Sequence, residues 1–127
     1  RLVGSEMCIR DSYEDDDFKV ILDASPATKG HALILPKQHY ANIFEIEDET
    51  LAKAAKLAKK VITHEKEVLG CDGYNVLQNN GEAAGQTVFH FHMHLIPRKA
   101  GDQAVPEWEH LSLSDDEMKE ICAKMKM

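Results

Sequence analysis

The chain has 127 residues and a formal net charge of −7, with 22 aspartates and glutamates against 15 lysines and arginines. This length predicts one domain with a modest core and excludes a second. The acidic balance, with no basic cluster on one recognisable face, argues against a nucleic-acid polymer as partner, because such binding depends on neutralising phosphates; a mononucleotide remains compatible.

The first twelve residues, Arg1–Ser12, differ in character from the rest of the chain. They resemble the translation of a transposon-type sequencing-library adaptor, so residues 1–12 are interpreted as a non-native segment and are set apart from the fold. The alternative is a genuine short disordered terminus. Residues 13–127 then form one domain, without an internal repeat, a low-complexity tract or a linker.

Two strands are predicted next. Phe18–Leu22 has the pattern of a strand and runs into a turn at Asp23–Pro26, where the proline interrupts pairing. His31–Leu35 is predicted as the following strand, ended by Pro36.

A long helix is predicted from about Asp48 to Leu69, because apolar residues recur there with helical spacing. Gly70 is a natural stop for it. Its lysines lie mostly off the apolar stripe, and we interpret them as a solvated face rather than a binding patch. The apolar set is Leu51, Ala54, Ala55, Ala58, Val61, Ile62, Val68 and Leu69, and the lysines are Lys53, Lys56, Lys59 and Lys60.

The second half of the chain predicts two more strands and a short helix. Tyr74–Leu77 is a strand that leads into a loop of amides, glycines and a hydroxyl at residues 78–87, and the next strand follows from Val88. Ser114 and Glu117 have the spacing of a capping box, which predicts a final helix that ends near Met125. The order of the elements predicts an α+β domain built on an antiparallel sheet.

Three histidines at alternate positions, His90, His92 and His94, are the most informative feature. Side chains at alternate positions of a strand share one face, so we predict three imidazoles on one surface. The opposite, buried face would contain Phe91, Met93 and Leu95, with Val88 and Phe89 extending the strand.

Such a histidine surface allows three interpretations. An imidazole has an unperturbed pKa of about 6.5, so it serves as base, nucleophile, acid or metal ligand near neutral pH. The three could hold a zinc ion, one could attack phosphorus while its neighbours hold charge and orientation, or the face could be solvated without a task. The loop before them favours phosphate, because Gly81 and Gly85 allow close backbone approach and its amides are neutral donors.

At this point the sequence resembles the histidine triad (HIT) family of nucleotide hydrolases and transferases, as a bacterial-type member similar to the Hint branch. The family pattern is His-x-His-x-His followed by two apolar residues, which here runs from His90 to Ile96. The resemblance implies a sheet with one long helix and a short C-terminal helix, and a homodimer in which two sheets join. Further matching blocks are Asp23–Pro26, Gly30–Lys37 and Gly85–Val88, and the likeness runs from about Tyr13 to about Asp102.

The resemblance implies covalent catalysis. His92 would be the nucleophile and would form a transient nucleotidyl-histidine, with its other ring nitrogen held by a main-chain carbonyl near the first histidine. His94 would donate to the α-phosphate oxygens, His31 would flank that phosphate, and His90 would order the others. No cofactor would be required for catalysis. A surface histidine is the alternative for His31.

Recognition of the nucleotide is also implied by the resemblance. Asp23 would take the ribose hydroxyls, Asn79 would contact the ribose-phosphate side, and Gln86 and Thr87 would donate to phosphate or leaving-group oxygens. The alternatives are turn formation for Asp23 and strand-entry polarity for Gln86 and Thr87. Candidate walls of the base pocket are Ile21, Leu22 and Leu33, which could equally be core residues.

Bacterial members of the family often carry a Cys-x-x-Cys pair that joins two histidines at a structural zinc. Only Cys8 is present here, inside the segment set apart, while His39 and His90 match the histidine ligands. A structural zinc is therefore expected in a native full-length protein and not in this chain. Cys71 and Cys122 are isolated, so no disulfide framework is expected. No apolar run reaches the roughly 18 residues of a membrane span, and we expect a cytoplasmic protein.

The sequence thus predicts a hydrolase of AMP conjugates, of the nucleoside 5′-phosphoramidase type. The segment Pro97–Asp102 departs from the glycine-rich ending of purine nucleoside phosphoramidases, so hydrolysis of dinucleoside polyphosphates is the alternative. A nucleotide- or partner-binding module with vestigial catalysis is the alternative of another class. A catalytic zinc hydrolase on the three histidines is a further hypothesis, which predicts inactivation by chelators.

Overall fold

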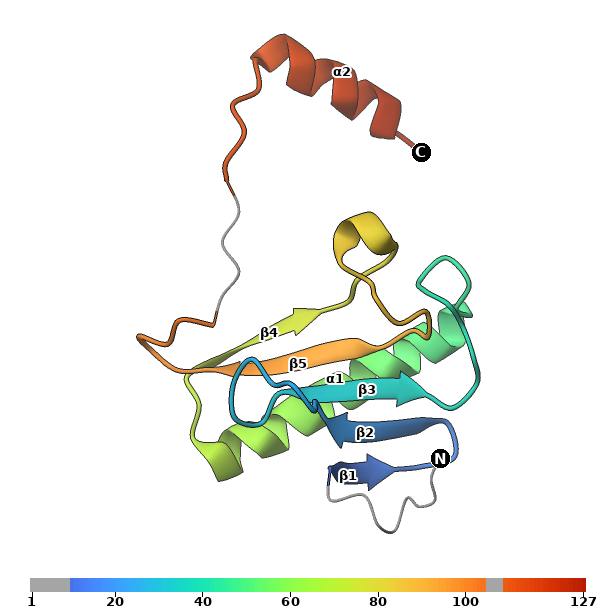
Figure 1. The fold of residues 1–127 in the computed structure, drawn as a ribbon. Coiled ribbons are helices and arrows are strands. Elements are labelled where there is room, and N and C mark those ends of the chain that lie inside the picture. Colours follow the sequence, from blue (N-terminus) through green and yellow to red (C-terminus); the bar gives the residue numbers. More distant parts are fainter. Residues whose placement is uncertain (1–9, 105–108) are drawn as a thin grey trace.

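Five strands form one antiparallel sheet in the computed structural model, which describes residues 10–104 and 109–127 (Figure 1). The strand order is β1-β2-β3-β5-β4, so β5 lies between β3 and β4. The α+β class with one long helix and a C-terminal helix is confirmed. The elements are β1 Asp11–Glu14, β2 Phe18–Leu22, β3 Ala32–Pro36, α1 Asp48–Leu69, β4 Gly73–Leu77, a 3-10 turn Glu82–Ala84, β5 Met93–Arg98 and α2 Asp115–Met125.

The helix α1 covers one face of the sheet (Figure 1) and closes the hydrophobic core. Val20 and Ile34 are cross-strand partners on that face, and both are fully buried. Ala54, Leu57 and Ala58 are the buried residues of the helix. The sheet and α1 therefore share one core, and the other face of the sheet stays open for chemistry.

The predicted bounds of α1 are confirmed. Gly70 adopts the left-handed conformation, with φ of 67°, and its N–H donates to the carbonyl of Lys66 at 2.9 Å. A residue without Cβ is favoured there, which explains the stop. The four lysines predicted to form a solvated face are exposed. The apolar stripe differs from the prediction at two positions. Leu57, which was not in the predicted set, is buried in the core, and Val68, which was, is exposed by 62%.

The strand that carries the histidines begins later than predicted. It starts at Met93, so the expectation of a strand from Val88 is wrong, and Val88 and Phe89 are exposed by 60% and 48%. In residues 88–92, side chains form hydrogen bonds with main-chain carbonyls that would otherwise pair with a neighbouring strand. Gln86 Nε2 lies 3.1 Å from the Val88 carbonyl, and His92 Nδ1 lies 2.7 Å from the His90 carbonyl. The buried side predicted for Phe91, Met93 and Leu95 is confirmed.

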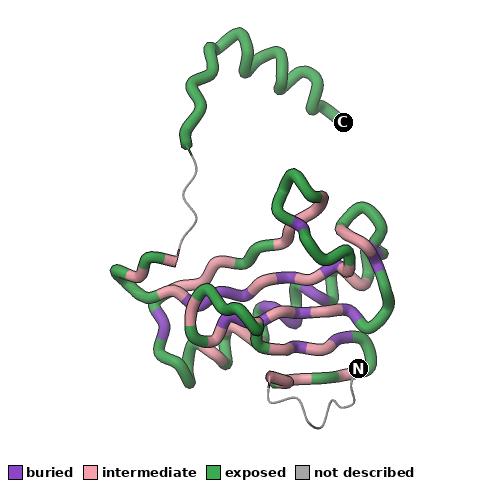
Figure 2. Tube along the Cα trace, viewed as in Figure 1, coloured by how far each residue is buried: buried purple, intermediate pink, exposed green. Residues whose placement is uncertain are grey.

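The helix α2 begins with the predicted capping box. Ser114 Oγ accepts from the Glu117 N–H, and Glu117 Oε1 accepts from the Ser114 N–H, both at 3.1 Å. Every residue of α2 is exposed, and the helix stands away from the sheet (Figure 2).

The boundary drawn after residue 12 stays a prediction. Residues 1–9, including Cys8, lie outside the described residues, while β1 already begins at Asp11 and the Arg10 carbonyl accepts from the Leu22 N–H at 2.8 Å. Among the helices of the described ranges, none combines the length and apolar character that crossing a membrane requires.

Substitutions of two valines test the assignment of the core. Val20→Ala removes two buried methyl groups and should lower the free energy of unfolding by about 1.5–3 kcal/mol. Val88→Ala is the matched control on an exposed side chain and should change it by less than about 0.5 kcal/mol. Urea denaturation measures both, and equal losses would contradict the assignment.

Candidate active site

The open face of the sheet carries a row of side chains from four strands. Ile21 pairs with Leu33, Leu33 pairs with His94, and His94 pairs with Leu77. Directly paired residues of antiparallel strands share a face, so these four lie side by side, opposite the core. Leu22 points to the other face, toward α1, which separates it from the two other candidate pocket walls.

His31 and His94 form the centre of this face. His31 Nε2 lies 2.9 Å from His94 Nδ1, although the two residues are 63 positions apart in the sequence. The carboxylate of Asp23 approaches the same pair, with Oδ2 3.6 Å from His31 Nε2. The backbone pairing of the two adjacent strands thus brings three predicted site residues together.

Main-chain geometry fixes the protons of this pair. The Ala27 N–H donates to His31 Nδ1 at 2.9 Å, so Nδ1 is an acceptor and the proton of the neutral ring lies on Nε2. That proton is donated to His94 Nδ1, which places the proton of neutral His94 on its own Nε2. His94 is therefore prepared to donate a hydrogen bond from Nε2.

Burial lowers the pKa of both histidines. For His31, removal from water is the main cause of the lowered pKa, and the negative charge of Asp23 opposes part of this shift. For His94, removal from water comes first, followed by repulsion from protonated His92 and His31, and Asp23 again opposes the shift in pKa. Both rings therefore stay neutral to a lower pH than a free histidine does.

His92 is held by the main chain as the family pattern implied. Its Nδ1 lies 2.7 Å from the carbonyl oxygen of His90, and a carbonyl only accepts, so Nδ1 carries the proton. The neutral ring then has its lone pair on Nε2. The rings of His92 and His94 meet edge to face, with centroids 5.0 Å apart.

His90 belongs to a different cluster from the other two histidines of the motif. Its Nε2–H donates to the Pro36 carbonyl at 2.8 Å, and its Nδ1 lies 3.0 Å from Nδ1 of His39. The ring thus ties the segment before β5 to the end of β3, and the expectation of three imidazoles on one strand face is wrong. The structure brings His39 and His90 together, the pair matched by resemblance to zinc ligands.

Two histidine clusters offer metal-ligand atoms, and they fit a cation differently. The ligand atoms of Asp23, His31 and His94 lie within 4.8 Å of one another. A metal on His31 Nε2 would move the ring proton to Nδ1, where the Ala27 N–H already donates, so two donors would face each other. His39 and His90 fit better, because the Pro36 carbonyl accepts the remaining proton of His90, the usual support of a metal-bound imidazole.

The polar loop between β4 and β5 is organised by Gln86. This side chain is 2% exposed, and its Oε1 accepts from the Gly81 N–H at 2.8 Å. Its Nε2 donates to the carbonyls of Ala41 at 2.6 Å and Val88 at 3.1 Å. Both amide hydrogens are therefore engaged with the main chain, which makes Gln86 an anchor of the loop rather than the predicted donor to phosphate.

The remaining predicted contacts lie at the surface of the site. Thr87 is exposed, and Asn79 is half-buried near Gly85. Asp23 Oδ1 accepts from the Ser25 N–H at 2.8 Å, so one oxygen forms the turn while the other faces the histidines. The turn-forming and binding interpretations of Asp23 are compatible, because the two oxygens are separate.

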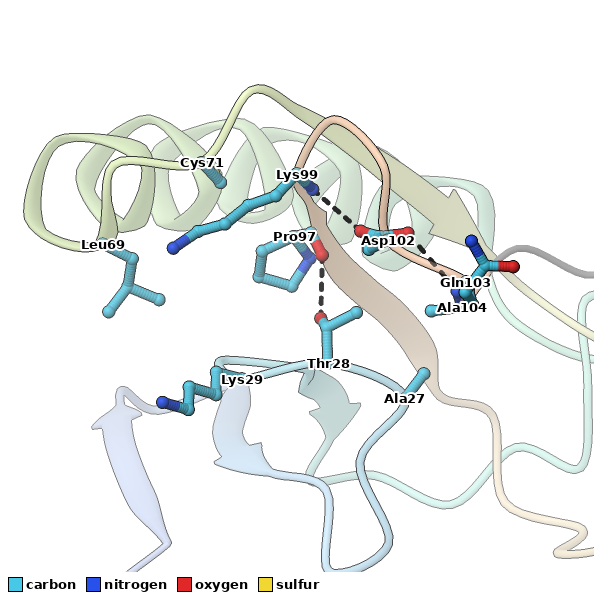
Figure 3. Close-up of a pocket in the computed structure, with 10 residues that line it drawn as sticks. All are labelled: Ala27, Thr28, Lys29, Leu69, Cys71, Pro97, Lys99, Asp102, Gln103 and Ala104. Carbon is cyan, nitrogen blue, oxygen red and sulfur yellow. Dashed lines mark hydrogen bonds between the residues drawn. The ribbon is translucent and has the colours of Figure 1, made fainter.

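A cavity of about 540 Å³ lies elsewhere, lined among others by Thr28, Leu69, Cys71, Pro97 and Lys99 (Figure 3). None of the predicted site residues lines it. The Thr28 hydroxyl donates to the Pro97 carbonyl at 2.8 Å across it, which ties the loop before His31 to β5. This cavity is distinct from the histidine face.

Sequence reasoning missed two main-chain groups of the site. The N–H of Ala27 and the carbonyl of Pro36 set the ring protons of His31 and His90, and a sequence carries no signal for either contact. Leu77 beside His94 was also missed, although alternation along its predicted strand could have indicated its face.

Comparisons with family models and with curated proteins identify the family of this chain. A model of the HIT domain matches residues 10–101. The adenosine 5′-monophosphoramidase hnt1 of Schizosaccharomyces pombe is 41% identical over 110 residues, which cover 83% of this chain and 80% of that protein. The adenylylsulfatase HINT3 of Arabidopsis thaliana is 40% identical over 99 residues, which cover 78% of this chain and 50% of that protein.

Solved structures share the fold as well. The crystal structure of a HIT family member from Bacillus subtilis has a TM-score of 0.84 at 31% identity, covering 95% of this chain and 88% of that one. A zinc-bound histidine triad protein from Mycobacterium smegmatis has a TM-score of 0.72 at 41% identity, covering 75% and 69%. The chain therefore belongs to the HIT family of nucleotide hydrolases and is similar to its Hint-like proteins.

Proposed function

We propose that this HIT family hydrolase cleaves AMP conjugates at the α-phosphate, as a nucleoside 5′-phosphoramidase, with His92 as nucleophile. The observation that carries the proposal is the contact between His92 Nδ1 and the His90 carbonyl, which leaves the lone pair on Nε2. A neutral nucleophile also avoids repulsion by the anionic phosphate. The name of the relative hnt1, a phosphoramidase, supports the choice of reaction.

The reaction balances in two steps. His92 Nε2 forms a bond to the α-phosphorus as the bond from phosphorus to the amine breaks, and the amine leaves with a proton taken from solvent. Water then attacks the nucleotidyl-histidine and gives a proton back to solvent, the bond between phosphorus and Nε2 breaks, and AMP is released with neutral His92 restored. Each step passes through a phosphorus centre with increased negative charge on its oxygens, which hydrogen-bond donors stabilise.

His94 is proposed to supply one such donor. Its Nε2–H is set by the chain from Ala27 through His31, so no reorientation is needed when the charge develops. Asp23 Oδ2 is the proposed acceptor for ribose, and Ile21 and Leu33, in the same row as His94, are the proposed walls of the base pocket. Asn79 is proposed to contact the ribose-phosphate side, and Thr87 is proposed to donate to phosphate or leaving-group oxygens.

The leaving group is the least constrained part of the proposal. Hydrolysis of dinucleoside polyphosphates remains the second candidate, because the Pro97–Asp102 segment is held in a compact turn by the Arg98–Asp102 ion pair and departs from the phosphoramidase pattern. The adenylylsulfatase name of HINT3 indicates that relatives differ in this group. A binding module with vestigial catalysis is the candidate of another class.

The assembly and the location are proposed on the same basis. A homodimer with joined sheets is implied by the family, and β1 and β4 are the edge strands of the described sheet. In a native full-length protein with the Cys-x-x-Cys pair, of which this chain has only Cys8, a structural zinc would be held by that pair with His39 and His90, and it would support the fold rather than the reaction. Location in the cytoplasm stays a prediction from the sequence.

Release of AMP from adenosine 5′-phosphoramidate tests the function directly. His92→Ala should lower turnover by at least about 10⁴-fold while AMP binding persists, because only the nucleophile is lost. His64→Ala, on the exposed side of α1, is the matched control and should keep full turnover. The same assay with diadenosine tetraphosphate as substrate tests the second candidate, hydrolysis of dinucleoside polyphosphates.

The unsubstituted chain should also capture labelled AMP covalently, and His92→Ala should not. Binding of AMP without turnover of either substrate and without capture would overturn the hydrolase in favour of the binding module. Loss of turnover with a chelator would instead support the zinc hydrolase.

The pH dependence follows from the lowered pKa of His31 and His94. Their neutral forms hold the hydrogen-bonded pair, so both rings should keep their neutral forms, and the pair its hydrogen bond, as the pH falls below 6.5 until it reaches the lowered values. Asp23→Asn removes a charge that raises both values, so each pKa should fall further. Imidazole NMR titration measures this shift independently of substrate binding, and a rise in either pKa would refute the assignment.

Two substitutions separate donation to substrate from support of the loop. Thr87→Val should lower kcat about 10²-fold with little change in KM, as expected for a lost donor. Gln86→Met should instead increase hydrogen exchange at residues 81–88, because it releases three main-chain groups. Wild-type kcat in Thr87→Val would rule out its proposed contact.

A further inference from the structure

The cavity of Figure 3 contains none of the residues proposed to contact the substrate. Its volume of about 540 Å³ lies within the range of about 300–1,000 Å³ that small-molecule sites occupy in proteins. Three segments enclose it: the loop at residues 27–29, the end of α1 with Cys71, and the end of β5 with the turn at residues 99–104. The cavity is therefore separate from the histidines and has the size of a ligand site.

Hydrogen bonds hold the walls of this cavity in place. The Thr28 hydroxyl donates to the Pro97 carbonyl at 2.8 Å, which joins the first wall to the third. The Asp102 carboxylate accepts from Arg98 Nε at 3.0 Å and from the Lys99 N–H at 2.8 Å, which closes the turn. A site whose walls are already ordered loses less conformational entropy on binding than a site that must first be ordered.

The interior of the cavity is mostly apolar. Pro97 and Cys71 are buried beside it, and Ala27 and Ala104 add small side chains. Leu69 also lines it and is exposed by 42%. An apolar body in the cavity would cover Leu69, and removal of apolar surface from water favours binding.

Two lysines give the cavity a positive charge. Lys29 and Lys99 line it, both are exposed, and in Figure 3 both side chains extend toward the side on which Leu69 lies. In the part of the chain that the structure describes, neither ammonium group forms an ion pair. Asp102 is the acidic side chain of the lining, and Arg98 compensates its charge. The charge of the cavity therefore favours an anion.

One wall of the cavity is also the support of His31. The Ala27 N–H donates to His31 Nδ1 at 2.9 Å, and the Thr28 carbonyl accepts from the His31 N–H at 3.2 Å. Ala27 and Thr28 both line the cavity. A molecule bound there would contact the segment that determines which ring nitrogen of His31 carries the proton.

We propose that this cavity binds a small organic anion with an apolar body, such as a carboxylate with an aliphatic chain. The anionic group lies by Lys29 and Lys99, and the apolar body covers Leu69. The bound anion contacts Ala27 and Thr28 and thereby changes the environment of the His31 imidazole. The inference goes beyond the proposed function, because the ligand is not the nucleotide and the cavity is not the histidine face.

Calorimetric titration with octanoate tests the binding. The unsubstituted chain should bind octanoate and should not bind n-octylamine, which has the same apolar chain with the opposite charge. Lys29→Met combined with Lys99→Met should raise the dissociation constant of octanoate at least about tenfold, because two charge-assisted contacts are lost. Lys59→Met, on the exposed side of α1, is the matched control and should change it by less than about twofold.

Three results of this titration would overturn the proposal: no binding of octanoate, equal affinity for n-octylamine, or an unchanged dissociation constant in the double lysine variant.

Alkylation of Cys71 locates the bound octanoate. The chain has three cysteines, so Cys8→Ser combined with Cys122→Ser leaves Cys71 as the single thiol. Iodoacetamide should modify Cys71 more slowly when octanoate is present at saturation, because the ligand fills the cavity beside the thiol. Binding that leaves the rate of alkylation unchanged would place octanoate elsewhere and would contradict the proposal.

Imidazole NMR of His31 tests the effect on the histidine face. The ring signals of His31 should shift in proportion to the occupancy by octanoate, while those of His64, exposed on α1, stay constant. Unchanged His31 signals at saturation would refute the contact through Ala27 and Thr28. These measurements need no substrate, so turnover of adenosine 5′-phosphoramidate reports separately on the proposed function.

Discussion

The antiparallel register between β3 and β5 is the constraint on which the candidate site depends. It pairs Leu33 with His94 and Ala32 with Leu95, which sets His94 on the open face and Leu95 in the core. A shift by one residue would turn every side chain of β5 to the other face and would bury the imidazole. Because His31 directly precedes β3, the same register brings its ring to 2.9 Å from His94.

Main-chain groups then set the chemical state of each imidazole. One N–H, from Ala27, and two carbonyls, from His90 and Pro36, determine which nitrogen of His31, His92 and His90 carries the proton. These groups belong to bends and strand ends, where the backbone is not occupied by ladder hydrogen bonds. The irregular path from residue 86 to residue 92 is therefore what makes the orientation of His92 possible, and a continuous strand would have used the His90 carbonyl for pairing.

The same irregular path depends on a buried amide. Gln86 satisfies one N–H and two carbonyls that would otherwise be unpaired beneath the loop, and such groups are costly to leave without partners. The loop from residue 41 is held to it through the Ala41 carbonyl, and Asn80 accepts from the Ile43 N–H in the same region. The two loops that border the histidine site thus form one hydrogen-bonded unit.

The sequence by itself determined the class of fold, most element bounds and the chemistry of the motif. Periodicity identifies α1 and the strands because burial repeats every 3.6 or two residues, and Gly70 and the Ser114 capping box mark helix ends through local geometry. Tertiary structure decided the start of β5, the separation of His90 from His92 and His94, and the ring protons of His90 and His94. Those features depend on hydrogen bonds between segments distant in the sequence, such as His31 with His94 and Gln86 with Ala41, and no local pattern encodes such contacts.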